Sequence, residues 1–201
     1  MTKRDQMLNE LAGDNDYGVL LMVQMDSVPE TIQCVVATTT HDEAAGGLRD
    51  QHRYVLRAVG VTEHSVGVGM FKSARVLDDH PLLHQYNANP AALFFRGTPD
   101  NASELVLDLF QQYASTFGPW RQIPTYLNLS RPLIEMVKSG GDLVGQMPRP
   151  LADNLAKAFE LHGCETKITE DKPEGPPRKV LLLDDSYIVA MDFSVDLLGQ
   201  S

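Results

Sequence analysis

The chain has 201 residues, of which 43% are hydrophobic, an ordinary share for a folded globular protein and too high for a disordered one. A chain of this length buries about two thirds of its unfolded surface, so its core needs no disulfide or metal support. Its formal net charge is −10, from 17 Lys and Arg against 27 Asp and Glu. Because nucleic acids and anionic membranes are bound largely through Lys and Arg, the composition argues against both as partners.

The cysteines and the N-terminal residues bear on the cellular compartment. Cys34 and Cys164 are far apart and no CxxC pair occurs, so the sequence predicts no disulfide framework. The first residues are charged and polar, whereas a signal peptide carries an apolar run there. The first apolar run, residues 19–23, is far shorter than the roughly 20 residues of a membrane span. We expect a cytoplasmic protein with reduced thiols and no membrane partner.

The chain begins with a helical pattern that changes to a strand pattern. Residues 3–12 place their apolar side chains on one helix face and are followed by Gly13, a common stop after a helix. Residues 17–25 and 31–39 are rich in Val, Ile, Leu and Thr and flank a short polar segment with a proline. This arrangement predicts a β-hairpin.

Three further strands are expected before residue 98. Residues 53–61 and 66–77 predict a second hairpin around residues 62–65, with a bulge at Gly69, where the alternation changes phase. Residues 91–96 predict a fifth strand. Short connections of this kind favour antiparallel neighbours, so the first 98 residues predict an antiparallel meander.

Helical spacing dominates the middle of the chain. Asn101 is the expected cap of a helix whose inner residues recur at every fourth position, Leu105, Leu109, Tyr113 and Phe117. Further helices are predicted over residues 130–140 and 149–161, each followed by glycine. Residues 164–170 predict an edge strand and residues 171–178 a flexible loop.

The last strand patterns, residues 179–183 and 187–195, flank Asp184-Asp185-Ser186 and predict a C-terminal hairpin. Together the patterns predict an α+β fold, in which an antiparallel β-meander of about five strands packs with three helices and a C-terminal β-hairpin. We expect residues 1–201 to form a single compact domain with two lobes. Residues 1–98 form the β-rich lobe, and residues 99–201 contain the helices and the terminal hairpin.

Asp78, His80 and His84 form the densest group of potential metal ligands. Two histidines four residues apart share a helix face, as in HExxH zinc sites, but the general-base glutamate is missing here. Pro81 also places His80 at the start of a helix. We therefore expect Asp79 or His80 to cap a short turn whose leucines enter the core, with a metal site as the alternative.

His41 follows a strand, in the kind of loop where catalytic groups are common, and Asp42 and Glu43 beside it are expected to be solvated. His162 is expected to end a helix before Gly163. The alternative function for the chain is a metal-dependent or His/Asp-based hydrolase, with a site built from His80, His84, Asp78 and His41.

The leading candidate for a binding site is the segment that holds the single tryptophan, Trp120. Arg121 and Tyr126 follow it, and Pro119 stiffens the turn before it. Aromatic and Arg side chains are enriched at binding hot spots because they bury large areas at a low cost in side-chain entropy. The structural alternative is that Trp120 closes the end of the core after the long helix.

No nucleotide, metal or nucleophile motif of known spacing occurs, so the sequence predicts no cofactor. The leading hypothesis is a non-enzymatic intracellular module that binds a protein or small-molecule partner, with enzymatic activity left open as the alternative. Open sheets have edge strands that must be covered or paired, and symmetric dimers are the commonest oligomers. We expect a homodimer, with the monomer as the alternative.

Overall fold

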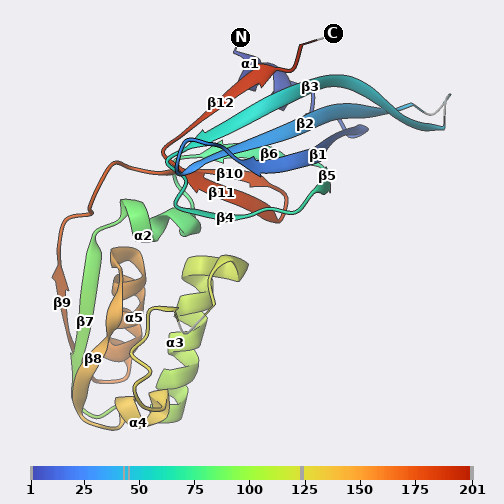
Figure 1. The fold of residues 1–201 in the computed structure, drawn as a ribbon. Coiled ribbons are helices and arrows are strands. Elements are labelled where there is room, and N and C mark those ends of the chain that lie inside the picture. Colours follow the sequence, from blue (N-terminus) through green and yellow to red (C-terminus); the bar gives the residue numbers. More distant parts are fainter. Residues whose placement is uncertain (1, 43, 45, 123–124, 200–201) are drawn as a thin grey trace. The chain divides into compact units, whose positions relative to one another are not determined.

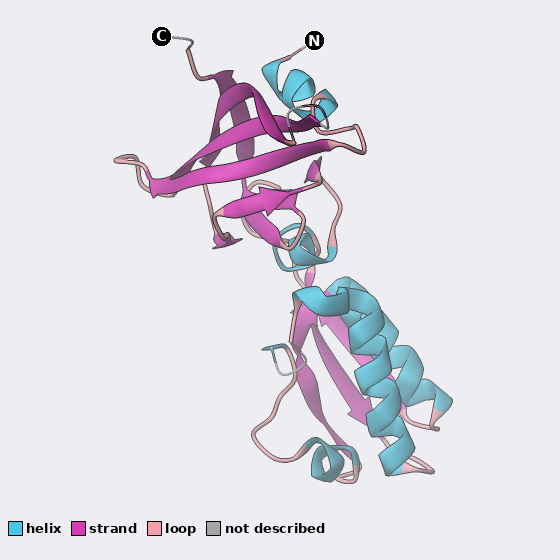
Figure 2. Cartoon of the chain, turned by 90° about the vertical axis from the view of Figure 1, so that its right-hand side faces the viewer, coloured by secondary structure: helices cyan, strands magenta, loops and turns pink. Residues whose placement is uncertain are grey.

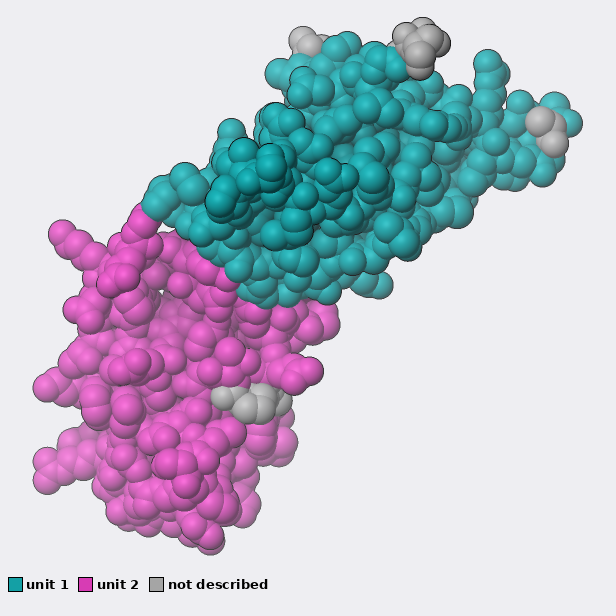
Figure 3. Space-filling model, viewed as in Figure 1, with its two compact units in different colours: residues 1–79, 176–201 teal, residues 80–175 magenta. Residues whose placement is uncertain are grey.

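The computed structural model describes residues 2–42, 44, 46–122 and 125–199 and has an α+β fold with antiparallel sheets (Figure 1). The chain divides into two compact units, residues 1–79 with 176–201 and residues 80–175 (Figure 3). The expected lobe boundary near residue 98 lies inside the second unit, and the C-terminal hairpin belongs to the first. Each unit has a hydrophobic core of its own.

The first unit is a β-sandwich with one short helix. Its elements are α1 (Lys3–Asn9), β1 (Asp16–Met25), β2 (Thr31–Asp42), β3 (Gly47–Val59), β4 (Glu63–Ser65), β5 (Gly69–Phe71), β6 (Ala74–Leu77), β10 (Lys179–Leu183), β11 (Ser186–Ala190) and β12 (Asp192–Leu197). The strand orders are β12-β3-β2-β1-β5 and β4-β11-β10-β6, and every pairing is antiparallel. Buried side chains from both sheets form a single core.

The first predicted hairpin is confirmed, since β1 pairs with β2 along nearly its whole length. Along β2 the alternate residues Ile32, Cys34 and Val36 are buried in the core, which is the period expected of a half-buried strand. The initial helix is also confirmed, as α1. Its cap is a capping box, in which the Thr2 hydroxyl accepts from the Asp5 N–H and the Asp5 carboxylate accepts from the Thr2 N–H.

The second predicted hairpin is wrong. Strand β3 pairs with β2 and β12, and the expected turn at residues 62–65 contains β4, which pairs with β11. Residues 66–77 are divided between β5 on one sheet and β6 on the other. Between them, the Asp184 carboxylate accepts hydrogen bonds from the Lys72 and Ser73 N–H groups at 2.8 and 2.9 Å, so these two residues leave the strand ladder.

The C-terminal hairpin is correct for β10 and β11, and Asp184 and Asp185 make its turn. Asp184 has a φ of 49°, a left-handed conformation that Asp tolerates better than most residues. The second predicted arm is longer than β11, because the chain crosses after Ala190 to the other sheet and continues there as β12 beside β3. The predicted strand pattern continues without a break through β11 and β12, so the sequence pattern does not reveal that the chain changes sheet between them.

The second unit contains a three-stranded antiparallel sheet and its helices. Its elements are η1 (Pro81–Leu83), α2 (His84–Asn87), β7 (Pro90–Arg96), α3 (Ala102–Phe117), η2 (Gly118–Trp120), α4 (Leu133–Val137), β8 (Gly141–Pro148), α5 (Arg149–Leu161) and β9 (Glu165–Glu170). The strand order is β8-β7-β9. Residues 91–96 are therefore a strand as predicted, but they form the centre of a separate sheet and take no part in a five-stranded meander.

Both long helices lie on one side of this sheet (Figure 2). Helix α5 packs against all three strands, with the ring of Phe159 stacked on that of Phe95 at 4.7 Å between centroids, and α3 packs against α5. The helices predicted over residues 102–117 and 149–161 are confirmed. The helix expected over residues 130–140 covers only Leu133–Val137, and β8 begins at Gly141. Within the described part of the chain, no helix has the length and apolar content required to cross a membrane.

Candidate functional site

The segment that carries Tyr126 is held against β8 in the second unit. Leu127 forms an isolated bridge with Gly145, and the Asn128 N–H donates to the Val144 carbonyl at 2.7 Å. Gly145 permits this close approach, because a Cβ atom at that position would clash with the Tyr126 carbonyl oxygen. The backbone of Tyr126 is thereby fixed next to the sheet.

The ring of Tyr126 is fixed as firmly as its backbone. It stacks on the buried ring of Phe117, with 5.4 Å between centroids and 23° between planes, and the ring of Tyr113 lies 6.5 Å away. Its hydroxyl donates to Oε1 of Gln85 in α2 at 2.8 Å. Aromatic rings at these separations attract one another beyond the area they bury, so the side chain is positioned before any partner arrives.

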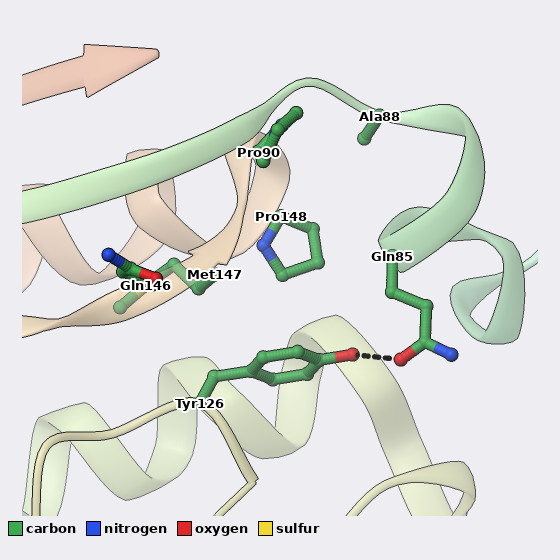
Figure 4. A pocket seen from close by; sticks show the side chains of 7 residues that line it. All are labelled: Gln85, Ala88, Pro90, Tyr126, Gln146, Met147 and Pro148. Atoms are coloured by element: carbon green, nitrogen blue, oxygen red, sulfur yellow. Dashed lines mark hydrogen bonds between the residues drawn. The ribbon is translucent and has the colours of Figure 1, made fainter. Parts of the chain in front are cut away.

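Tyr126 forms one wall of a pocket of about 170 Å³ (Figure 4). In Figure 4 the tyrosine ring faces Pro148 and Met147 across the pocket, and Gln85 reaches its hydroxyl from α2. The lining is neutral and mostly apolar, and its polar side-chain groups are the Gln85 and Gln146 amides and the Tyr126 hydroxyl. The described residues that line it are Gln85, Ala88, Pro90, Tyr126, Gln146, Met147 and Pro148.

Trp120 and Arg121, the other two predicted binding residues, lie close to this site but outside the lining. Trp120 is half-buried, and its ring meets the His80 ring edge-on at 5.1 Å between centroids. Arg121 is half-buried and lies close to Tyr113. Burial raises the pKa of the Tyr113 hydroxyl, and the hydrogen bond with Thr125 and the Arg121 cation oppose that rise.

The predicted cap at His80 is confirmed. Its Nδ1 accepts a hydrogen bond from the Leu82 N–H at 3.3 Å, and Leu82 and Leu83 are buried below the short turn. The ring of His84 lies 5.9 Å from that of Phe117, at the border of the same aromatic group. His80 therefore stabilises the start of this short turn.

The remaining candidate ligands, Asp78 and His41, belong to the first unit, where His41 is an exposed residue near the end of β2. Glu43 lies outside the described residues. Across the ranges that the structure describes, no group of three His, Cys, Asp or Glu side chains has an arrangement suited to a metal ion.

Cys34 is buried, and burial raises the pKa of its thiol to about 11, which leaves it a protonated core residue at neutral pH.

The predicted role of His162 as the end of a helix is confirmed, since it caps α5 before Gly163, which has a φ of 77°. Its Nε2 lies 2.8 Å from the Asp108 carboxylate of α3, so the side chain also joins the two long helices.

The first unit contains a cluster that sequence reasoning missed, centred on Glu10. The Glu10 carboxylate accepts hydrogen bonds from the Thr38 and Tyr54 hydroxyls at 2.7 and 2.9 Å and from the Gln6 amide at 3.1 Å. His52 Nδ1 lies 2.9 Å from the same carboxylate. These contacts join the end of α1 to β2 and β3. The partners are far apart in sequence, so no local pattern could have indicated them.

The sequence analysis also missed most of the residues that line the pocket. Pro90, Met147 and Pro148 come from the ends of two strands, one of which was not predicted, and Gln85 comes from a four-residue helix. Of the lining residues, only Tyr126 could be suspected from the sequence, as an aromatic residue close to a rigid turn.

Comparison with protein-family models, curated proteins and solved structures finds no match to this chain.

Proposed function

We propose that this chain is a protein-binding module and that the pocket at Tyr126 receives one large apolar side chain of its partner. The observation that carries the proposal is the size and lining of the pocket, about 170 Å³ with neutral, mostly apolar walls. An apolar cavity of about 150 Å³ holds one benzene molecule. Sites for drug-sized ligands and cofactors usually occupy about 300–1,000 Å³. The volume therefore suits a single anchor residue better than a cofactor.

The fixed geometry of Tyr126 supports this function. A side chain that is already stacked and hydrogen-bonded loses little rotamer entropy when a partner binds, and such preorganisation raises affinity. Gln146 adds a polar amide to the otherwise apolar lining, where the backbone of a bound segment needs a hydrogen-bonding partner. The alternative hydrolase gains no support, because His80 is used as a helix cap and the described residues include no metal-ligating group of three.

The experiment uses the full chain and a minimal side-chain probe, N-acetyl-phenylalaninamide, in an NMR titration. Burial of one such side chain supplies about 1.5–3 kcal/mol, so weak binding is expected, with a Kd of about 6–80 mM. Shifted resonances should cluster around Tyr126 and Met147, and N-acetyl-glycinamide should produce none. Ala88→Leu fills the pocket and should abolish the response, whereas Ala114→Leu, at an exposed position on α3, should preserve it. Equal responses in both variants would disprove the assignment.

A further inference from the structure

We infer that the partner segment carries a Lys or Arg close to its apolar anchor residue, and that Asp171 and Glu174 select it. This inference rests on the function proposed for the Tyr126 pocket and adds the charge of the partner. The charge preference is inferred from two hollows next to the Tyr126 pocket, from the charged side chains that line them, and from the ion pairs nearby.

Two further hollows lie beside the Tyr126 pocket and share lining residues with it. A hollow of about 590 Å³ shares Gln85, Ala88 and Pro90 with it, and one of about 130 Å³ shares Pro90 and Gln146. Asp171 lines both of these hollows, and its N–H donates to the Pro90 carbonyl at 3.0 Å. A segment that is anchored in the Tyr126 pocket and continues past Pro90 into either hollow would therefore meet Asp171.

The charges available at these hollows are mainly negative. Asp171 and Glu174 are exposed, and neither side chain forms an ion pair or a hydrogen bond with another residue of the described part. Glu170, by contrast, is already ion-paired, because its carboxylate lies 2.7 Å from the Arg149 guanidinium, which also contacts Asp153 at 2.8 Å. Lys172 also lines the larger hollow and partly offsets the two carboxylates.

The balance favours a basic partner on electrostatic grounds. Two carboxylates and one ammonium group leave a net charge of −1 at the larger hollow, on a chain whose formal net charge is −10. Complementary charge at the rim of an interface accelerates encounter and excludes partners of the wrong sign. An acidic segment would place like charges beside Asp171 and Glu174 and would bind less well.

The test compares two capped pentapeptides by NMR titration of the full chain at low salt. Both contain one phenylalanine, which is flanked by two lysines in one peptide and by two glutamates in the other. We expect the lysine peptide to bind about fivefold more tightly or better, and added salt to reduce the difference, since exposed charge pairs are weak and screened. Lys172→Ala should strengthen binding of the lysine peptide about twofold.

The double variant Asp171→Asn with Glu174→Gln should remove most of this preference and leave the binding of N-acetyl-phenylalaninamide unchanged. Glu165→Gln is the matched control, because it removes an exposed glutamate at the opposite end of β9. Equal affinity for the two peptides, with binding still abolished by Ala88→Leu, would overturn the charge preference and leave the pocket proposal standing. A preference that persists in the double variant would overturn the assignment to Asp171 and Glu174. Absence of binding by every probe would overturn both proposals.

Discussion

The hydroxyl of Tyr126 donates a hydrogen bond to Oε1 of Gln85 at 2.8 Å, although 41 positions separate the two residues in sequence. This contact joins α2 to the segment that lies against β8, and the two together supply facing walls of the pocket. The pocket therefore depends on the folded state of the whole second unit. Substitutions of residues that support either wall should therefore alter binding, even where the substituted residue does not contact the ligand.

Trp120→Ala should lower the free energy of unfolding by about 1–3 kcal/mol, less than the roughly 3–5 kcal/mol lost when a fully buried aromatic residue is truncated. The reason is that Trp120 is only half-buried and packs edge-on against His80. Urea denaturation measures the change. Binding of N-acetyl-phenylalaninamide should persist, because Trp120 does not line the Tyr126 pocket. Unchanged stability together with lost binding would instead make Trp120 a direct contact.

Gly145→Ala should displace the Tyr126 segment, because the new Cβ would lie 3.2 Å from the Leu127 Cα and closer still to the Tyr126 carbonyl oxygen. We expect a loss of about 1–3 kcal/mol of stability, together with faster hydrogen exchange of the Asn128 amide, which donates to Val144. Gly67→Ala is the control, since a Cβ there meets no atom within 4 Å. An Asn128 amide protected equally in both variants would contradict the predicted displacement.

Glu10→Gln should weaken the first unit in a pH-dependent way. Burial raises the pKa of Glu10, but hydrogen bonds from Thr38, Tyr54 and Gln6 outweigh that effect and hold it below its ordinary value of 4.5. A depressed pKa stabilises the folded state above about pH 4.5, and this stabilisation is lost as the pH falls through the folded-state pKa.

The variant should therefore be about 1–3 kcal/mol less stable at pH 7, and the difference should shrink below pH 4.5. Urea midpoints at pH 7, 5 and 3.5 measure this difference. A gap that stays constant over that range would show that Glu10 does not stabilise the fold through its charge.

The segment 80–175, expressed alone, should fold cooperatively. Its buried core is drawn from residues 91–164, all of which lie inside this segment, and its three strands pair only with one another in the described part of the chain. Thermal unfolding followed by circular dichroism is the measurement. A gradual, non-cooperative melt would mean that the unit depends on the rest of the chain.

The sequence predicted elements whose signals are local. Four-residue spacing and the Asn101 cap identify α3, alternation identifies β1 and β2, and the polar turn at Asp184 identifies the β10–β11 hairpin. In each case, neighbouring residues determine which face is buried and where the element ends. The same kind of signal gave the capping role of His80, which needs only the N–H of a residue two positions later.

Residue patterns by themselves therefore predict the α+β class, the helices α1, α3 and α5, and strands such as β1, β2, β7 and β10, but neither β8 nor the division of residues 66–77 between two sheets. The tertiary structure alone decided how strands are shared among three sheets, where the chain leaves one unit for the other, and which residues meet at Tyr126. Strand partners such as β3 with β12, and pocket residues such as Gln85 and Pro148, are distant in sequence. Their proximity depends on backbone hydrogen bonds and core burial summed over the whole unit, and these long-range interactions leave no trace in a local pattern of residues.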